Sequence, residues 1–221
     1  MSELTENLAV CIERGKINQA ASYPPDLRGK EGADEIARNA LAAGETADAI
    51  LEGCMTGMSR IGEKFGQNKV FVPDLLMAAK AMNAAMAHLK PYFKSGAVKH
   101  KGRFVVGTVA GDLHDIGKNL VAMVVEGGGW EVVDLGVDVP PEKFVDAVKA
   151  NPGCVVGLSA LLTTTMVNME KTVQLIKAGH PDAMVLVGGA PVTAAFADQI
   201  GADGYSSDPQ GAVKLLESKA A

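Results

Sequence analysis

One histidine stands between two acidic residues in a short loop that could hold a metal. The segment AGDLHDIGKN, residues 110–119, places His114 two residues after Asp112 and directly before Asp115. An imidazole can bind a metal through one ring nitrogen while the other donates to a carboxylate, which fixes the tautomer and raises the ligand's basicity. The pattern therefore indicates metal ligation by His114. A surface histidine beside acids in a turn is the alternative interpretation.

The other residues of this loop narrow the kind of site. A phosphate-binding P-loop does not fit, because five residues separate Gly111 from Gly117 and Asn119 replaces the required Ser or Thr. A zinc site needs three or four protein ligands, and no neighbouring loop of the expected fold carries another histidine or cysteine. A single protein ligand suits a metal that a macrocycle already coordinates.

The second half of the chain alternates short apolar runs with helical segments. The runs that predict strands cover residues 103–109, 131–137, 154–160, 183–189 and 203–206. Five such units in about 120 residues predict a parallel sheet with helices on both faces. A doubly wound sheet of five strands commonly has the order 2-1-3-4-5 and binds ligands beyond the carboxyl ends of strands one and three. The two loops at that position are AGDLHDIGKN and SALLTTT.

The first half predicts a small bundle of helices up to about residue 92. Its apolar residues recur at helical spacing in three sets, of which the last is Leu75, Ala79, Met82, Met86 and Leu89. Pro73 is expected in the first turn of the final helix, and Pro91 is expected to mark its end.

These patterns divide the chain into three parts. We expect a helical cap domain over residues 1–93, a polar linker over residues 94–102 and an α/β domain over residues 103–221.

Composition and charge argue against several classes of protein. The net charge is −5 and no dense cluster of Lys and Arg occurs, so neither nucleic acid nor an anionic membrane surface is an expected partner. The first residues include acids and no long apolar run, so they are not a secretory signal. No stretch approaches the roughly 18 apolar residues that span a bilayer. We expect a cytoplasmic protein whose three cysteines are reduced and buried.

Three ordered motifs resemble the signature of cobalamin-binding domains. The pattern DxHxxG…SxL…GG is matched in order by Asp112, His114, Gly117, Ser159, Leu161, Gly188 and Gly189. This signature belongs to cobalamin-dependent methionine synthases, adenosylcobalamin mutases and the corrinoid proteins of methanogens and acetogens. The phrases GDLHDIGKNLV, DLGVDVPPE and GADGYSSDP resemble the small corrinoid proteins of methyltransferase systems. VFVPDLLMAAKAM, in the first half, is also similar, so the resemblance covers nearly the whole chain.

The resemblance implies a fold and a ligand for cobalt. The fold would be a flavodoxin-like, Rossmann-like cobalamin-binding domain preceded by a helical cap. His114 would be the lower axial ligand, replacing the dimethylbenzimidazole of the cofactor. Asp112 would hydrogen-bond the distal imidazole nitrogen, and Thr165 would stand where methionine synthase has the serine that completes this relay.

The resemblance also implies further contacts with the cofactor. Ser159 and Thr163 would line a channel for the nucleotide tail, and glycines at 117, 188 and 189 would leave room for it. The expected set is completed by Asp115, Ile116, Leu161 and Tyr205. Phe71, Leu75 and Met82 would shield the upper face of the corrin, although packing in the bundle core is the alternative role of these three.

The function that the resemblance implies is that of a methyl carrier. The chain would hold a cobalamin or another corrinoid and move a methyl group from a substrate-specific methyltransferase to a methylcorrinoid:acceptor methyltransferase that uses tetrahydrofolate or a thiol. A reductive activator would be a further partner. No catalytic group independent of the cofactor is recognisable. The alternatives are a subunit of an adenosylcobalamin mutase, a light-sensing regulator and a doubly wound domain for another ligand. The methyl donor stays open among methanol, a methylamine, a betaine and a methoxylated aromatic.

Overall fold

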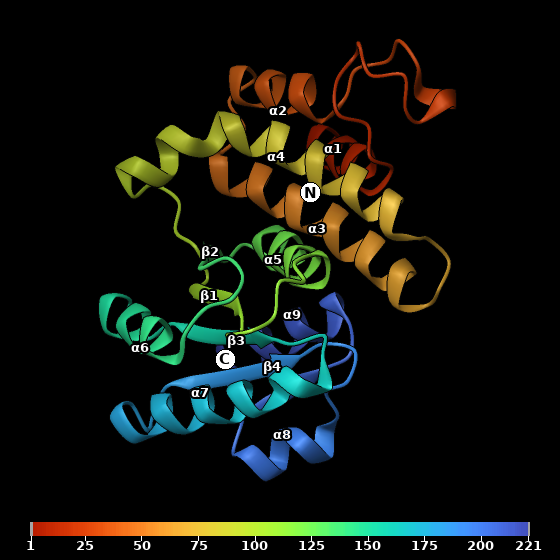
Figure 1. The fold of residues 1–221 in the computed structure, drawn as a ribbon. Coiled ribbons are helices and arrows are strands. Elements are labelled where there is room, and N and C mark those ends of the chain that lie inside the picture. Colours follow the sequence, from red (N-terminus) through yellow and green to blue (C-terminus); the bar gives the residue numbers. More distant parts are fainter. Residues whose placement is uncertain (1, 221) are drawn as a thin grey trace. The chain divides into compact units, whose positions relative to one another are not determined.

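The computed structural model describes residues 2–220, which form helices alone in the first half and strands alternating with helices in the second (Figure 1). The first half contains α1 (Glu3–Glu13), α2 (Ala33–Ala42), α3 (Ala47–Gly66) and α4 (Val72–Ser95). A 3-10 turn, η1 (Pro25–Leu27), lies between α1 and α2. The apolar faces of these helices supply buried residues that include Leu8, Ile12, Ile36, Ile50, Met58, Leu75, Met82 and Leu89.

The two ends of α4 test the two proline predictions. Phe71 is the N-cap residue and Pro73 lies in the first turn, as predicted. The prediction that the helix ends at Pro91 is wrong, because α4 continues to Ser95 and ends where Gly96 adopts a left-handed conformation with φ 75°. Pro91 lacks an amide hydrogen, so one helical hydrogen bond is lost, but the turns on either side still form. The non-helical connection between the halves therefore begins at Gly96, two residues later than the expected linker.

The second half contains a five-stranded parallel sheet. Its strands are β1 (Arg103–Thr108), β2 (Glu131–Asp134), β3 (Val155–Ser159), β4 (Met184–Gly188) and β5 (Gly204–Ser206), in the order β2-β1-β3-β4-β5. The predicted order is confirmed. Each strand lies inside the run that predicts it; the other residues of the runs lie in loops, except that Val109 forms a parallel bridge with Val139.

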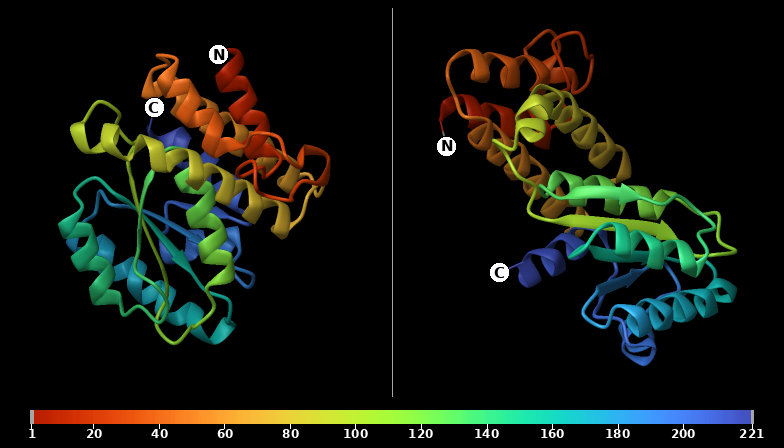
Figure 2. Two further views of the ribbon diagram at one scale, coloured as in Figure 1. Left: turned by 90° about the horizontal axis from the view of Figure 1, so that it is seen from above. Right: turned by 90° about the vertical axis from the view of Figure 1, so that its left-hand side faces the viewer.

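Helices connect successive strands and cover both faces of this sheet (Figure 2). The connecting helices are α5 (Ile116–Gly127), α6 (Pro141–Ala150), α7 (Met166–Gly179) and α8 (Ala194–Ile200). A last helix, α9 (Pro209–Ala220), follows β5. A second 3-10 turn, η2 (Thr163–Thr165), leads into α7. In the part of the chain that is described, none of the helices is both long and apolar enough to cross a bilayer.

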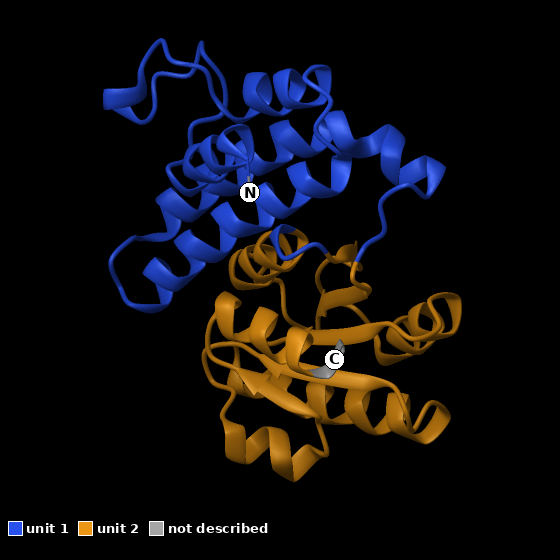
Figure 3. Cartoon of the chain, turned by 180° about the vertical axis from the view of Figure 1, so that it is seen from behind, with its two compact units in different colours: residues 1–100, 127–129 blue, residues 101–126, 130–221 orange. Residues whose placement is uncertain are grey.

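The two halves are compact units (Figure 3). The first unit holds the chain up to His100 together with residues 127–129, and the second holds the remainder from Lys101 onward. We refer to them as the helical unit and the sheet unit.

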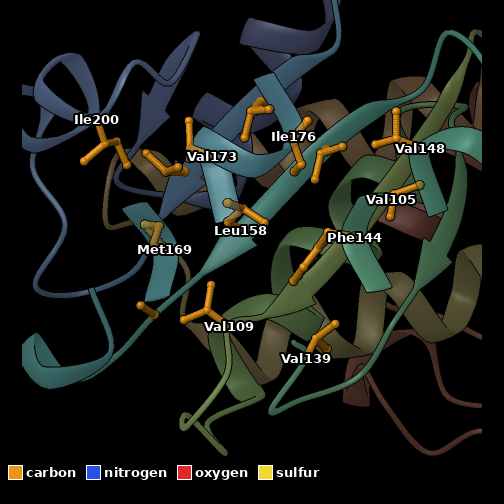
Figure 4. Close-up of a cluster of buried hydrophobic side chains, with 14 of the residues drawn as sticks. Val105, Val109, Val139, Phe144, Val148, Leu158, Met169, Val173, Ile176 and Ile200 are labelled. Carbon is orange, nitrogen blue, oxygen red and sulfur yellow. The ribbon is translucent and has the colours of Figure 1, made fainter. Parts of the chain in front are cut away.

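One face of the sheet unit packs into a continuous apolar core (Figure 4). Val105 and Leu158 from the strands meet Phe144 of α6 and Val173 and Ile176 of α7, and all five are at most 2% exposed. The α6, α7 and α8 helices therefore share this face. Because the core fixes the strands and these helices, the loops between them begin at defined positions.

Candidate functional site

The carboxyl ends of four strands form one row. Thr108 pairs with Ser159, Ser159 with Gly188, and Gly188 with Ser206 in the parallel register. The loops that leave these strands consequently begin side by side. The three motifs of the sequence signature, far apart along the chain, meet at this carboxyl edge of the sheet.

Asp112 is fully buried at the carboxyl edge, and donors surround its carboxylate. Oδ1 accepts from the ring nitrogen Nδ1 of His114 at 2.7 Å and from the His114 backbone N–H at 3.1 Å. Oδ2 accepts from the N–H groups of Leu161 at 2.7 Å and Leu162 at 3.2 Å, and from the Thr165 hydroxyl at 2.9 Å. The carboxylate thus joins the loops that follow β1 and β3.

These contacts keep the carboxylate ionised. Burial acts to raise the pKa of Asp112, but the hydrogen bonds from Leu161, from the ring and backbone of His114 and from Thr165 outweigh it and hold that pKa well below its ordinary range. A buried anion with this many donors is fixed in orientation as well as in charge.

The ionised carboxylate in turn fixes the tautomer of His114. A carboxylate accepts but does not donate, so Nδ1 of the ring must carry the proton and Nε2 presents its lone pair. The His114 side chain is 50% exposed, so this lone pair is open to a ligand. The buried Thr108 also restrains the residue, since its hydroxyl donates to the His114 carbonyl at 2.9 Å.

Large apolar side chains around His114 are exposed instead of buried. They come from the loops after β1, β2 and β3 and from the first residue of α5, and comprise Leu113, Ile116, Val137, Leu161 and Leu162. Exposed apolar side chains near the His114 imidazole suit a large partner with an apolar rim. Sequence reasoning selected Ile116 and Leu161 but missed the other three, although apolar residues in an otherwise polar loop were a usable signal.

The donor set fits a corrinoid. Among the described residues, no group of three or more His, Cys, Asp or Glu side chains is placed to hold a metal. A single imidazole suits cobalt that a corrin ring already holds and does not suit a protein-only zinc centre, so His114 would be the residue that holds the metal of a corrinoid.

Two of the predicted glycines differ in what a side chain at their position would meet. A Cβ at Gly189 would overlap the carbonyl oxygen of Ala160, and Gly189 has φ 125°, so the protein's own backbone requires glycine there. A Cβ at Gly117 would meet nothing within 4 Å. Gly117 thus borders open space, as a contact with the cofactor tail would need.

The remaining predicted residues of the sheet unit lie at or near the same edge. Ser159 ends β3 and is half-buried, while Thr163 is exposed in η2. Asp115 is exposed and accepts from the Asn119 side chain at 3.1 Å. Tyr205 lies in β5 and packs against the apolar core. Their contacts with a cofactor tail stay predictions.

The three predicted cap residues differ in exposure. Phe71 is 70% exposed, whereas Leu75 and Met82 are buried. Of these three side chains, only that of Phe71 is exposed enough to contact a ligand. The role of all three above the corrin stays a prediction.

A cavity of about 700 Å³ lies at the opposite, amino edge of the sheet, with Trp130, Cys154 and His180 among its lining residues. The nitrogens Trp130 Nε1 and His180 Nε2 lack hydrogen-bond partners but are themselves buried, so a molecule in the cavity would not reach them.

Comparison with known proteins agrees with this site. Residues 102–214 match the family described as B12 binding domain, and residues 29–90 match a second B12 binding domain family. The chain is 45% identical to the trimethylamine corrinoid protein of Methanosarcina barkeri, over 85% of this chain and 89% of that protein. It is 42% identical to the dimethylamine corrinoid protein of the same organism, over 76% of this chain and 81% of that protein.

Two solved structures extend the agreement to the fold. A cobalamin-binding protein from Desulfitobacterium hafniense DCB-2 has a TM-score of 0.76 and 32% identity over 97% of both chains. A chain of the methanol:cobalamin methyltransferase complex from Methanosarcina barkeri has a TM-score of 0.82 and 28% identity, over 99% of this chain and 80% of that chain. The resemblance inferred from the motifs is confirmed, and the chain belongs to the family of small B12-binding corrinoid proteins.

Proposed function

We propose that this protein holds a corrinoid whose cobalt carries a methyl group between two methyltransferases. The observation that carries the proposal is the buried Asp112 carboxylate, which presents Nε2 of one histidine among exposed apolar side chains. Relatives that cover most of the chain are corrinoid proteins named for methylated amines. When bound, the corrinoid supplies a nucleophilic cobalt, while the protein supplies ligation and orientation.

Asp112, His114 and Thr165 divide the work of holding that metal. The Asp112 carboxylate stays ionised, so it supports a neutral ring that binds the metal through Nε2 and also a ring that has accepted a proton at the same nitrogen. The Thr165 hydroxyl keeps the second carboxylate oxygen engaged. The Asp112 carboxylate would therefore hold the His114 ring in one orientation whether or not a corrinoid is bound.

The proposed partners follow from the relatives. One solved relative is a chain of a methanol:cobalamin methyltransferase complex, and we place a substrate-specific methyltransferase as the first partner of this protein. A methylated amine is the donor class that we propose. The acceptor methyltransferase, the reductive activator and a cytoplasmic location stay predictions.

The test uses the full chain reconstituted with hydroxocobalamin and reduced. It is mixed with a methylamine:corrinoid methyltransferase and, in separate reactions, with trimethylamine, dimethylamine or methanol. We expect demethylated product in proportion to the reconstituted protein with a methylated amine, and none with apoprotein. Absence of product with every donor, while cobalamin remains bound, would contradict the proposed function.

A further inference from the structure

Two peptide groups close to the Asp112 side chain, Ala110–Gly111 and Asp112–Leu113, are held by partners outside this loop. The side-chain Nδ2 of Asn168, on α7, donates to the Ala110 carbonyl at 2.8 Å. The Gly111 N–H donates to Oδ1 of Asp138 at 2.6 Å. The Asp138 N–H donates to the Asp112 carbonyl at 3.0 Å. Asp138 comes from the loop after β2, so this loop and α7 both hydrogen-bond to the short backbone run 110–112.

We infer that Asp138 and Asn168 are positioning residues for the cobalt ligand. They fix the peptide run 110–112, which sets the direction of the Asp112 carboxylate and through it the ring of His114. The inference rests on the proposed role of His114 as that ligand. It adds two residues that hydrogen-bond the backbone around Asp112 and not the His114 imidazole.

The backbone of Asp138 supports a dedicated role. Asp138 has φ 52°, a left-handed conformation that costs most residues about 1–2 kcal/mol and that Asp and Asn tolerate best. The next residue, Val139, pairs with Val109 in a parallel bridge and donates to the Thr108 carbonyl at 2.9 Å. This pairing extends the sheet past the end of β2 and fixes where Asp138 stands. In that position both its N–H and its carboxylate face the Gly111–Asp112 segment.

Because Asp138 is exposed, an effect on the position of the metal ligand can be distinguished from an effect on the stability of the fold. The residue is exposed, so its hydrogen bond to Gly111 contributes little to the free energy of folding. Its effect on ligation is expected to be larger, because outer residues that orient a metal ligand commonly change affinity by about 10- to 100-fold. A small change in stability with a clear change in ligation is therefore the signature of the inferred role.

The test compares Asp138→Gly, Asp138→Asn and a matched control in the full chain loaded with cobalamin. Glycine keeps the left-handed backbone and removes only the carboxylate, whereas asparagine keeps an acceptor for the Gly111 N–H. The control is Asp203→Gly at the amino edge, because Asp203 likewise accepts a backbone N–H, from Val185 at 2.6 Å. The readout is the ratio of Co(II) ligated by protein nitrogen to Co(II) without it, from electron paramagnetic resonance of nitrogen-15-labelled protein.

We expect Asp138→Gly to lower this ratio roughly tenfold, Asp138→Asn to restore most of it, and Asp203→Gly to leave it unchanged. Asn168→Asp gives an independent check, since it keeps the side chain's shape but turns a carboxylate toward the Ala110 carbonyl, and it should also lower the ratio. A wild-type ratio in folded Asp138→Gly and Asn168→Asp would overturn the inference, as would an equal loss in Asp203→Gly. Wild-type protein without any protein-derived nitrogen splitting would instead contradict the proposed ligation by His114, on which the inference rests.

Discussion

Polar side chains differ in burial and pairing between the two edges of the parallel sheet. At the amino edge, Arg103 and Glu131 form an ion pair at 2.7 Å, and Lys177 and Asp203 form another at 2.6 Å, with all four side chains partly exposed. At the carboxyl edge, Asp112 is fully buried and accepts five hydrogen bonds. Exposed pairs contribute little free energy, whereas a buried, saturated anion orients whatever it touches. The difference identifies the carboxyl edge as the place built for chemistry.

Helix direction reinforces this difference. The α5 and α7 helices begin at the carboxyl edge, so the positive ends of their dipoles lie near the Asp112 anion. The same helices end at the amino edge, where Lys177 occupies the last turn of α7. The fold therefore favours an anion at one edge and cations at the other before any ligand binds.

The largest expected effect on folding is the loss of the buried carboxylate. Asp112→Ala removes the acceptor of five hydrogen bonds and should lower the free energy of unfolding by about 3–5 kcal/mol. Arg103→Ala, which breaks an exposed pair at the amino edge, should cost less than about 1 kcal/mol. Urea denaturation followed by the fluorescence of Trp130, the one tryptophan of the chain and part of the sheet unit, measures both. Equal losses would remove the distinction between the edges.

The pH dependence of stability sharpens the same comparison. The pKa of Asp112 is depressed in the folded protein, while an unfolded Asp titrates near about 3.9. Its contribution is therefore complete above that unfolded value and is lost as the pH falls toward the folded one. The gap in unfolding free energy between wild type and Asp112→Asn should narrow as the pH falls below about 4, by at most about 1.4 kcal/mol per pH unit. A gap that widens on acidification would show that Asp112 is not held as an anion.

A smaller effect is expected at the hydroxyl that completes the relay. Thr165→Val removes the donor to Asp112 at nearly constant volume and should cost about 1–2 kcal/mol, and Thr165→Ser should recover most of it. Thr172→Val is the matched control, because the Thr172 hydroxyl is also buried but donates only to the Asn168 carbonyl one helical turn earlier. Urea denaturation measures all three variants. An equal loss of unfolding free energy in Thr172→Val and Thr165→Val would mean that the hydrogen bond to Asp112 contributes no more than a local bond within a helix.

Much of the fold was predictable because its signals are local. Five short runs, four of them containing β-branched residues, predicted five strands, and the order followed from the common form of the doubly wound sheet. Pro91 misled the prediction of the α4 boundary, because a proline removes one hydrogen bond but does not by itself end a helix whose flanking turns are packed. The α2 helix was not predicted as a separate element, since its apolar face consists mostly of alanine.

The site was predictable only where side chains form an ordered pattern. Asp112 and His114 belong to the signature, Thr165 was placed by the resemblance to methionine synthase, and the hydrogen bonds among the three fall where that resemblance implies. Asp138 and Asn168 were missed, because each bonds to the backbone of a distant segment and leaves no side-chain pattern in the sequence. Such residues become visible only when the loops are seen together.

Ligation of cobalt by His114 is the central claim, and electron paramagnetic resonance of the Co(II) form tests it most directly. Full-length protein is labelled with nitrogen-15 and reconstituted with unlabelled hydroxocobalamin. We predict that the label changes the nitrogen splitting from a triplet to a doublet and that His114→Ala removes the protein-derived splitting, because Nε2 of His114 is then no longer present. A splitting that the label leaves unchanged would mean that the cofactor's own base still binds the cobalt, and it would contradict this account of the site.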